Sequence, residues 1–197
     1  EGFLFIDQYE LVMAQFYFKM GLHNQTVQFE HFFRSYPDYG SHKAGYCINA
    51  GLEWFVDWMM NTSITEKDIE LLKQSKTSDG KNLFSDDFLK WLKENGNFSA
   101  VNLKSIPEGR VIHPNVPITV VKGPLAILQM METALLNQIN YQILVATKAS
   151  RIKEIVKDQS ILEFGTRRGH DRGSIAGTRA ALIGGADFSS WKGYPIR

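Results

Sequence analysis

The sequence predicts an α+β domain that leads into the first β-α unit of an α/β structure. Capped amphipathic segments before residue 100 are typical of helices, and three β-branched runs between residues 101 and 122 predict a small antiparallel sheet. A strand-like run at 160–164, a loop and a small-residue segment at 173–183 then follow in β-α order. A composition shift near residue 158 predicts two domains, an N-terminal α+β domain at 1–157 and a truncated β-α unit at 158–197.

The composition indicates an ordinary globular protein. Of 197 residues, 44% are hydrophobic and 22% charged, and the formal net charge is +1. This balance argues against a nucleic-acid-binding surface over the whole protein, so any anion site must be local. The single cysteine, Cys47, cannot form an internal disulfide, which suits a reducing compartment and predicts a cytoplasmic protein. No apolar run approaches the roughly 20 residues of a membrane span.

The first third of the chain alternates helices and short strands. Asp7 is a candidate N-cap for a helix over 8–20, in which Leu11, Ala14 and Phe18 recur at spacings of three and four. A strand at 26–34 is expected next, followed by a proline-containing turn at 36–40. A shorter strand at 45–49 leads into an amphipathic helix at 50–60.

Two short helices are expected between residues 65 and 96. Thr65 and Asp68 form a capping-box pattern for the first, which reaches residue 74, and Ser85 is a candidate cap for the second. Asp86 and Asp87 could be a catalytic or metal-binding pair. The attraction of carboxylates to the positive end of a helix explains them better.

The β-branched runs lie at 101–106, 110–113 and 118–122, separated by proline-containing turns, and predict one antiparallel sheet. His113 stands alone beside a turn, so we interpret it as a structural residue rather than a metal ligand. Gly123 and Pro124 end the last strand. A long helix to about residue 156, with a bend near Asn140, is expected after them.

The most informative segment is Leu162-Glu-Phe-Gly-Thr-Arg-Arg-Gly-His170. A strand stops at a glycine and presents two adjacent arginines, Arg167 and Arg168, on one loop. Guanidinium groups stay charged and match phosphate or carboxylate oxygens in pairs, while Phe164 adds an aromatic face. Loops at the carboxyl ends of strands are where α/β proteins bind ligands. The segment therefore predicts an anion site, with an exposed surface turn as the alternative.

Eight ordered motifs over nearly the whole chain resemble nicotinate phosphoribosyltransferase, specifically its N-terminal part. They are Asp7-Gln-Tyr-Glu-Leu-Val-Met-Ala-Gln15, Phe29-Glu-His-Phe-Phe-Arg34, Ala50-Gly-Leu-Glu53, Pro107-Glu-Gly-Arg110, Val121-Lys-Gly-Pro-Leu125, Glu132-Thr-Ala-Leu-Leu-Asn137, Ala146-Thr-Lys-Ala149 and Glu163-Phe-Gly-Thr-Arg-Arg168. The resemblance implies a type II phosphoribosyltransferase, in which an α+β domain precedes an irregular α/β barrel that is incomplete in this chain.

The same resemblance implies an activity, which is the joining of nicotinate to phosphoribosyl pyrophosphate. The products are nicotinate mononucleotide and pyrophosphate, in NAD salvage. It implies Mg²⁺ with the phosphoribosyl pyrophosphate, ATP hydrolysis as in many ligase-type members, and a homodimer with shared active sites. Because Glu1 is no initiator methionine, we expect a segment of a longer polypeptide that is inactive in isolation.

The resemblance also assigns residues. Phe164 and the partner subunit's equivalent of Tyr9 match the aromatic pair that encloses the pyridine ring, and Arg167 matches the catalytic arginine that contacts pyrophosphate or the base carboxylate. Arg34, Lys148 and Arg168 are further basic candidates for substrate binding. No metal-ligating set is expected within the chain.

Two alternatives stay open at this level. The first is a relative that uses nicotinamide or quinolinate. The second is a non-catalytic binding or oligomerisation module on the same scaffold, since the family's histidine motif and downstream phosphate-binding glycines are absent up to Arg197. Nucleic-acid binding through Arg167 and Arg168 is a weaker third reading, because the net charge is close to zero.

Overall fold

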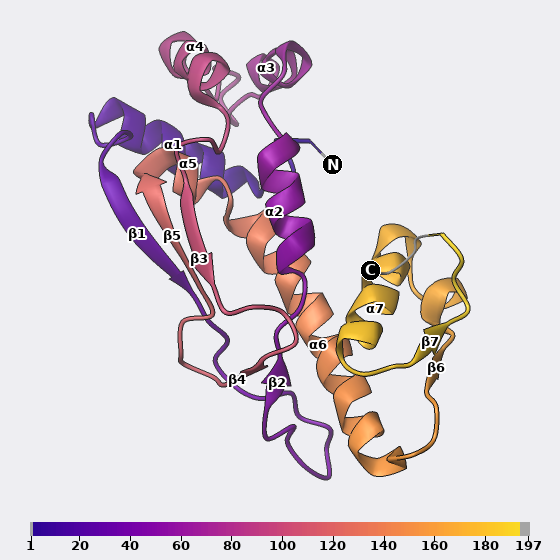
Figure 1. Cartoon of the computed structure of the whole chain (residues 1–197). Helices are drawn as coiled ribbons and strands as arrows, with labels where there is room; N and C mark the ends of the chain where they lie inside the picture. Colours follow the sequence, from indigo (N-terminus) through magenta and orange to yellow (C-terminus); the bar gives the residue numbers. More distant parts are fainter. Residues whose placement is uncertain (1, 194–197) are drawn as a thin grey trace. The chain divides into compact units, whose positions relative to one another are not determined.

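The computed structural model describes residues 2–193, in which groups of helices and groups of strands follow one another along the chain (Figure 1). The first half contains α1 (Gln8–Lys19), β1 (Thr26–His31), β2 (Cys47–Ile48), α2 (Leu52–Asn61), α3 (Glu66–Lys73) and α4 (Asp86–Asn95). The second half contains β3 (Asn102–Ser105), β4 (Val111–Ile112), β5 (Thr119–Pro124), α5 (Leu125–Gln129), α6 (Glu132–Val156), β6 (Leu162–Glu163), the 3₁₀ turn η1 (Gly165–Arg167), α7 (Asp171–Ile183) and β7 (Phe188–Ser189).

The chain forms two compact units, each assembled from separate segments. Unit 1 comprises Glu1–Phe29, Val56–Lys104 and Val120–Leu136, and unit 2 comprises Glu30–Phe55, Ser105–Thr119 and Asn137–Arg197. These units group the chain differently from the expected domains at 1–157 and 158–197, so that boundary stays a prediction. Residues 194–197 of the expected second domain lie outside the described residues.

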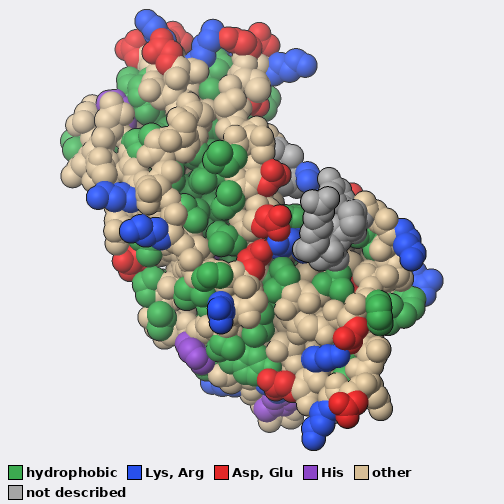
Figure 2. All heavy atoms as spheres, viewed as in Figure 1, with side chains coloured by type: hydrophobic (Ala, Val, Ile, Leu, Met, Phe, Trp, Pro, Cys, Tyr) green, Lys and Arg blue, Asp and Glu red, His purple; other side chains and the backbone are tan. Residues whose placement is uncertain are grey.

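Unit 1 has an aromatic core beneath its helices. Phe88 and Trp91 of α4 pack on Phe18 of α1, with ring centroids 5.9 and 5.7 Å apart, and Phe3 stacks on Phe98 at 5.4 Å. The outer faces of α3 and α4 carry interleaved acidic and basic side chains (Figure 2). Burial of the apolar stripe and solvation of the charged one explain why these short sequences fold as amphipathic helices.

The predicted caps have different outcomes. Thr65 and Asp68 form the capping box, since each side chain accepts from the backbone N–H of the other residue. Asp7 and Ser85 occupy N-cap positions with extended backbone, but neither side chain makes a cap hydrogen bond. The prediction of α1 and α4 is confirmed, whereas the side-chain capping by Asp7 and Ser85 was wrong.

The prediction of one sheet from residues 101–122 was wrong. β3 and β5 join β1 in a three-stranded sheet with the order β1-β5-β3, whereas β4 pairs with β2 in a separate antiparallel pair. In that pair Cys47 lies opposite Ile112, and both side chains are buried. Pairing of two apolar residues far apart in sequence thus prevailed over pairing with the neighbouring run.

The expected long helix after Pro124 is interrupted earlier than predicted. Pro124 is the last residue of β5, and α5 ends before Met130 and Met131, both fully buried. α6 then runs without interruption through Asn140, and the bend expected there stays a prediction. The break supplies a second helix N-terminus, at Glu132 and Thr133.

Within unit 2, small residues allow α6 and α7 to approach closely. Ala146 of α6 and Ala180 of α7 belong to one buried cluster, and Ala149 and Ala181 to another. A Cβ on Gly184 would lie 2.2 Å from the carbonyl oxygen of Ala146, so only glycine fits there. β6 and β7 are parallel, with Glu163 opposite Ser189, and α7 connects them as a β-α-β crossover.

In the described part of the chain, no helix has both the length and the apolar character needed to cross a lipid bilayer.

Candidate functional site

The two arginines lie on a tight loop between β6 and α7, here called the arginine loop (residues 163–170). Gly165–Arg167 form one 3₁₀ turn, and the carbonyl oxygen of Gly165 accepts from the backbone N–H groups of Arg168 at 2.8 Å and Gly169 at 3.0 Å. A Cβ on Gly169 would lie 2.8 Å from the Cα of Ser174, at the start of α7. The loop is therefore fixed by its own backbone and packed closely on α7.

Glu163, the last residue of β6 and the first of the arginine loop, fixes the rest of the loop through hydrogen bonds to its carboxylate. One carboxylate oxygen accepts from the N–H of Gly165, and the other accepts from the hydroxyl groups of Thr178 at 2.8 Å and Ser189 at 2.9 Å. The donors come from the loop, from α7 and from β7. A single carboxylate thus fixes the loop relative to the β-α-β unit, and such charge-assisted bonds are the stronger kind.

The arginine loop lines a hollow of about 250 Å³ together with β7. Its lining residues are Phe164, Thr166, Arg167 and Ser190. Phe164 is 48% exposed. The hollow therefore combines an exposed aromatic face, a permanent cation and two hydroxyl groups, which suits a small flat anion.

Three ion pairs anchor the β-α-β unit within unit 2. Lys153 of α6 donates to both carboxylate oxygens of Asp187, at 2.9 and 2.7 Å, and Asp187 also accepts from the N–H of Ile161 at 2.8 Å. Arg179 of α7 contacts Glu108 and Glu53. Sequence inspection did not single out Glu163, Glu108, Arg179 or Ser190. The one available signal was that Glu108 and Glu163 belong to motifs of the family resemblance.

Tyr9 lies in the first turn of α1, in unit 1. Its hydroxyl group lies near Glu132, and the residue is 48% exposed. Partial burial, then the interaction with Glu132 and the other nearby carboxylates, raise the pKa of the phenol well above its ordinary value. Tyr9 therefore stays neutral and offers an exposed aromatic face.

The remaining candidates are more scattered. Arg34 is exposed in the segment after β1, and Arg168 is exposed on the arginine loop. The ammonium group of Lys148, on α6, lies 4.6 Å from the ring centroid of Tyr39. This cation–π contact accounts for the position of the ammonium group. Of the six predicted site residues, the structure brings Phe164 and Arg167 together in one hollow. The roles of Tyr9, Arg34, Lys148 and Arg168 stay predictions.

A resident metal ion would need a set of ligands. Among residues 2–193, no group of three or more His, Cys, Asp or Glu side chains is arranged to hold one. Glu163, the acidic residue of the arginine loop, already accepts from three donors.

The family model and the similar curated proteins carry the same family name. The model of the nicotinate phosphoribosyltransferase (NAPRTase) N-terminal domain matches residues 4–140. Nicotinate phosphoribosyltransferase of Bacillus subtilis is 39% identical over 188 residues, which is 95% of this chain and 36% of that protein. Nicotinate phosphoribosyltransferase 2 of Arabidopsis thaliana is 36% identical over 187 residues, 93% of this chain and 32% of that protein.

The fold agrees with the sequence comparison. The crystal structure of human nicotinic acid phosphoribosyltransferase superposes with a TM-score of 0.80 at 31% identity, covering 93% of this chain and 35% of that one. The chain spans about a third of the length of the curated relatives it matches. The chain therefore belongs to the nicotinate phosphoribosyltransferase family.

Proposed function

We propose that this chain supplies the base-binding part of an enzyme that joins nicotinate to phosphoribosyl pyrophosphate, giving nicotinate mononucleotide and pyrophosphate for NAD salvage. The observation that carries the proposal is the hollow in which Phe164 and Arg167 lie side by side. A pyridine carboxylate needs one flat apolar surface and one fixed cation, and this hollow offers both.

The chemistry explains why these groups suit the reaction. Displacement of pyrophosphate from the ribose builds positive charge on the sugar and negative charge on the leaving group, so catalysis depends on positioning and on clamps for anions. Arg167 would hold either the base carboxylate or the departing pyrophosphate. Phe164 would carry the pyridine ring, with Tyr9 of a second copy on the opposite face.

The polar groups of the hollow favour nicotinate among the pyridine bases. A guanidinium group pairs with a carboxylate through two parallel hydrogen bonds, and Thr166 and Ser190 add hydroxyl groups. Nicotinamide would present a neutral amide to Arg167 and lose the charge-assisted bond. Quinolinate would bring a second carboxylate, for which the hollow has no second arginine among its lining residues.

Further parts of the proposal follow from the family. We propose that the β-α-β unit of β6, α7 and β7 begins an irregular α/β barrel, that Mg²⁺ arrives with the pyrophosphate group of the substrate, and that ATP hydrolysis can be coupled to the reaction. The Mg²⁺ would neutralise the leaving group, and Arg167 would supplement it. We also propose a cytoplasmic location.

The proposed assembly is a homodimer with shared active sites. Along α1 and its C-cap residue, apolar side chains at positions i, i+3, i+4, i+7 and i+11 are exposed, namely Tyr9, Val12, Met13, Phe16 and Met20. A stripe of this kind normally marks an interface. Because Tyr9 belongs to this stripe, a second copy that covers the stripe would receive Tyr9 of the first copy in its active site. Phe16→Glu should then yield monomers in light scattering, whereas Met60→Glu, at the exposed end of α2, should not.

The decisive experiment measures turnover with nicotinate, nicotinamide and quinolinate in the protein as it is expressed from its gene. We expect nicotinate to be preferred, and Arg167→Ala to lower kcat/KM about 100-fold. Arg110→Ala, a change of an exposed arginine outside the hollow, is the matched control. Preference for another base would identify the relative, and absence of turnover with all three bases, with folding intact, would favour the non-catalytic module.

A further inference from the structure

The first turns of α1 and α6 cap each other within unit 1. One carboxylate oxygen of Glu10, on α1, accepts from the backbone N–H of Thr133 at 3.0 Å and from its hydroxyl group at 2.6 Å. The hydroxyl oxygen of Thr133 in turn accepts from the backbone N–H of Asp7 at 3.2 Å. A side chain of each helix therefore accepts from a free backbone N–H at the start of the other helix. Among the described residues, neither helix start has an acceptor of its own for that N–H.

Glu10 is an unusual group to find in this position. Its exposed fraction is 0%, and among the described residues no donor reaches its second oxygen, Oε2. Burial, opposed by the bonds from Thr133 and assisted by the charges of Glu132 and Asp7, raises the pKa of the carboxyl group to about 7. Oε2 is thus the natural place for a proton, while Oε1 keeps its bonds to Thr133 in either state.

The groups around Glu10 leave little else to explain this arrangement. Asp7 and Tyr9 face it from α1, and Glu132 faces it from α6. α5, which also packs on α1, carries no charged residue, and α4 meets α1 two turns further on, at Phe18. Glu10 is therefore a buried acid without a cationic partner among the described residues, and it directly follows the tyrosine of the proposed base site.

We propose that Glu10 is the positioning residue for Tyr9: by joining the first turn of α1 to that of α6, it fixes the direction in which the exposed tyrosine ring is presented to the pyridine base. The inference rests on the proposed function and deepens it. The hydroxyl group of Tyr9 lies near Glu132, the residue before Thr133. Glu10 and its neighbour Tyr9 thus face two adjacent residues of α6, and loss of the Glu10 contact leaves, in the described part of the chain, only the bond from the N–H of Asp7 to Thr133 between the two first turns.

The test uses three variants with steady-state kinetics. Glu10→Ala should raise the KM for nicotinate about tenfold, with kcat and the KM for phosphoribosyl pyrophosphate changed less than threefold. Glu10→Gln keeps the oxygen that accepts from Thr133 and should restore the nicotinate KM to within threefold of the unmodified protein. Thr133→Val, which removes the hydroxyl group but no backbone, should raise the nicotinate KM selectively and serves if Glu10→Ala does not fold.

A second readout does not depend on catalysis. The NMR signal of ¹³C-labelled Tyr9, assigned with Tyr9→Phe, should shift and broaden in Glu10→Ala and Thr133→Val and stay in place in Glu10→Gln. An unchanged Tyr9 signal in both disruptive variants, or equal rises of the two KM values, overturns the positioning role. Absence of turnover in the unmodified protein, with the Tyr9 signal responding as described, refutes the proposed function and leaves the contact between the helices standing.

Discussion

Arg179 on α7 holds Glu108 through two parallel hydrogen bonds, Nη1 to Oε1 at 2.9 Å and Nη2 to Oε2 at 2.6 Å. The same Oε1 of Glu108 accepts from the backbone N–H groups of Gly51 at 2.5 Å and Leu52 at 2.9 Å, at the start of α2. Glu108 therefore caps one helix while it is paired with another. This ties α7, and with it the arginine loop, to the rest of unit 2.

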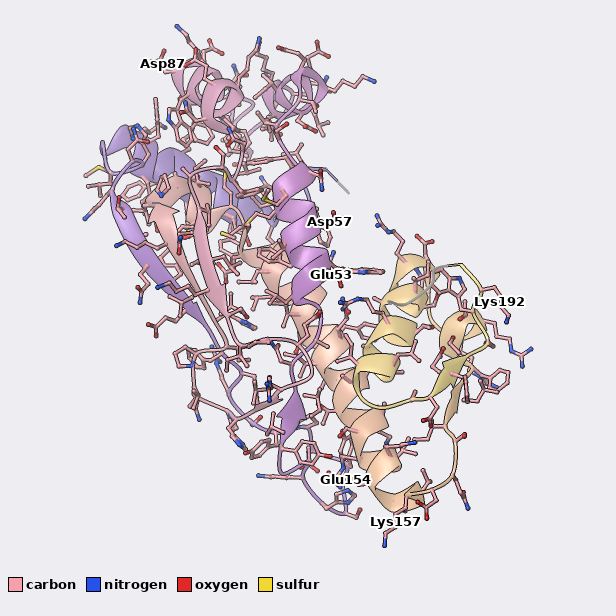
Figure 3. The ribbon with its side chains drawn as sticks, viewed as in Figure 1. Glu53, Asp57, Asp87, Glu154, Lys157 and Lys192 are labelled. Carbon is pink, nitrogen blue, oxygen red and sulfur yellow. The ribbon has the colours of Figure 1, made fainter. Side chains whose placement is uncertain are left out.

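The first prediction concerns the two acidic partners of Arg179. Glu108→Gln should lower the free energy of unfolding by about 2–4 kcal/mol, because it removes the less exposed carboxylate of a half-buried guanidinium and leaves only the exposed Glu53 among the described residues. Glu53, in the first turn of α2 (Figure 3), is 73% exposed, so Glu53→Gln should cost about 0.5 kcal/mol. Urea unfolding followed by tryptophan fluorescence measures both, and equal losses would contradict the assignment.

The Glu108 pair also has a pH signature. Burial alone would raise the pKa of Glu108, but Arg179 and the two backbone donors hold it below the ordinary 4.5. A depressed pKa contributes stability that is present above pH 4.5 and is lost as the pH falls through the folded-state value. The acid limb of the unfolding curve should therefore be shallower in Glu108→Gln than in the unmodified protein.

The second prediction concerns Glu163 beneath the arginine loop. Glu163→Gln should lower kcat/KM for nicotinate about tenfold, because an amide cannot accept from Gly165, Thr178 and Ser189 together and the loop loses its fixed position. The free energy of unfolding of this variant should be lower by about 1–3 kcal/mol, which is the cost of leaving a donor unpaired. Glu154→Gln, on α6 and bonded to Tyr46 by one hydrogen bond, is a matched control that should leave the nicotinate KM unchanged.

The third prediction compares two glycines at opposite ends of α7. Gly184→Ala should destabilise the protein by about 1–3 kcal/mol, because its Cβ would meet the carbonyl oxygen of Ala146 at 2.2 Å. Gly173 has open space around it within the same helix, so Gly173→Ala should stabilise by about 0.5 kcal/mol. Thermal unfolding of the two variants should shift in opposite directions, and a shift of the same sign would refute close packing of α6 on α7.

The fourth prediction concerns the buried acid of α1. Since the pKa of Glu10 rises from 4.5 to about 7 on folding, the folded state holds a proton that the unfolded state releases. The stability this contributes is complete below pH 4.5 and is lost as the pH rises through 7, by up to about 3 kcal/mol. Unfolding measured between pH 5 and pH 8 should show this decline, and Glu10→Gln should flatten it. A slope unchanged in the variant would assign the decline to other groups.

Local sequence signals gave most of the elements correctly. The Thr65–Asp68 capping box lies within one turn, so its geometry depends on four consecutive residues. The strand, glycine and two arginines at 162–168 likewise predicted a loop after a strand, and in the structure Arg167 and Phe164 of that loop line one hollow. These features are encoded within short stretches, where backbone preference and side-chain type act on their immediate neighbours.

Other features depended on residues distant in sequence. The pairing of β4 with β2 joins Ile112 to Cys47, and no property of the run around Ile112 distinguishes that partner from the adjacent strands. The break between α5 and α6 is stabilised by Glu10, more than 100 residues earlier. Local sequence signals indicate which segments can form helices or strands, whereas the burial of side chains decides which of these elements pack together.

What the sequence by itself determined is the order of most elements, the presence of a loop with two adjacent arginines after a strand and the family to which the chain belongs. Only the tertiary structure decided that Glu163, Glu108 and Glu10 are acceptors that join helices and loops rather than surface acids. The physical reason is that the sequence does not distinguish a glutamate that faces water from one whose carboxylate accepts from three donors. Folding alone brings Thr178, Ser189, Arg179 and Thr133 to these carboxylates, and desolvation then makes each contact matter.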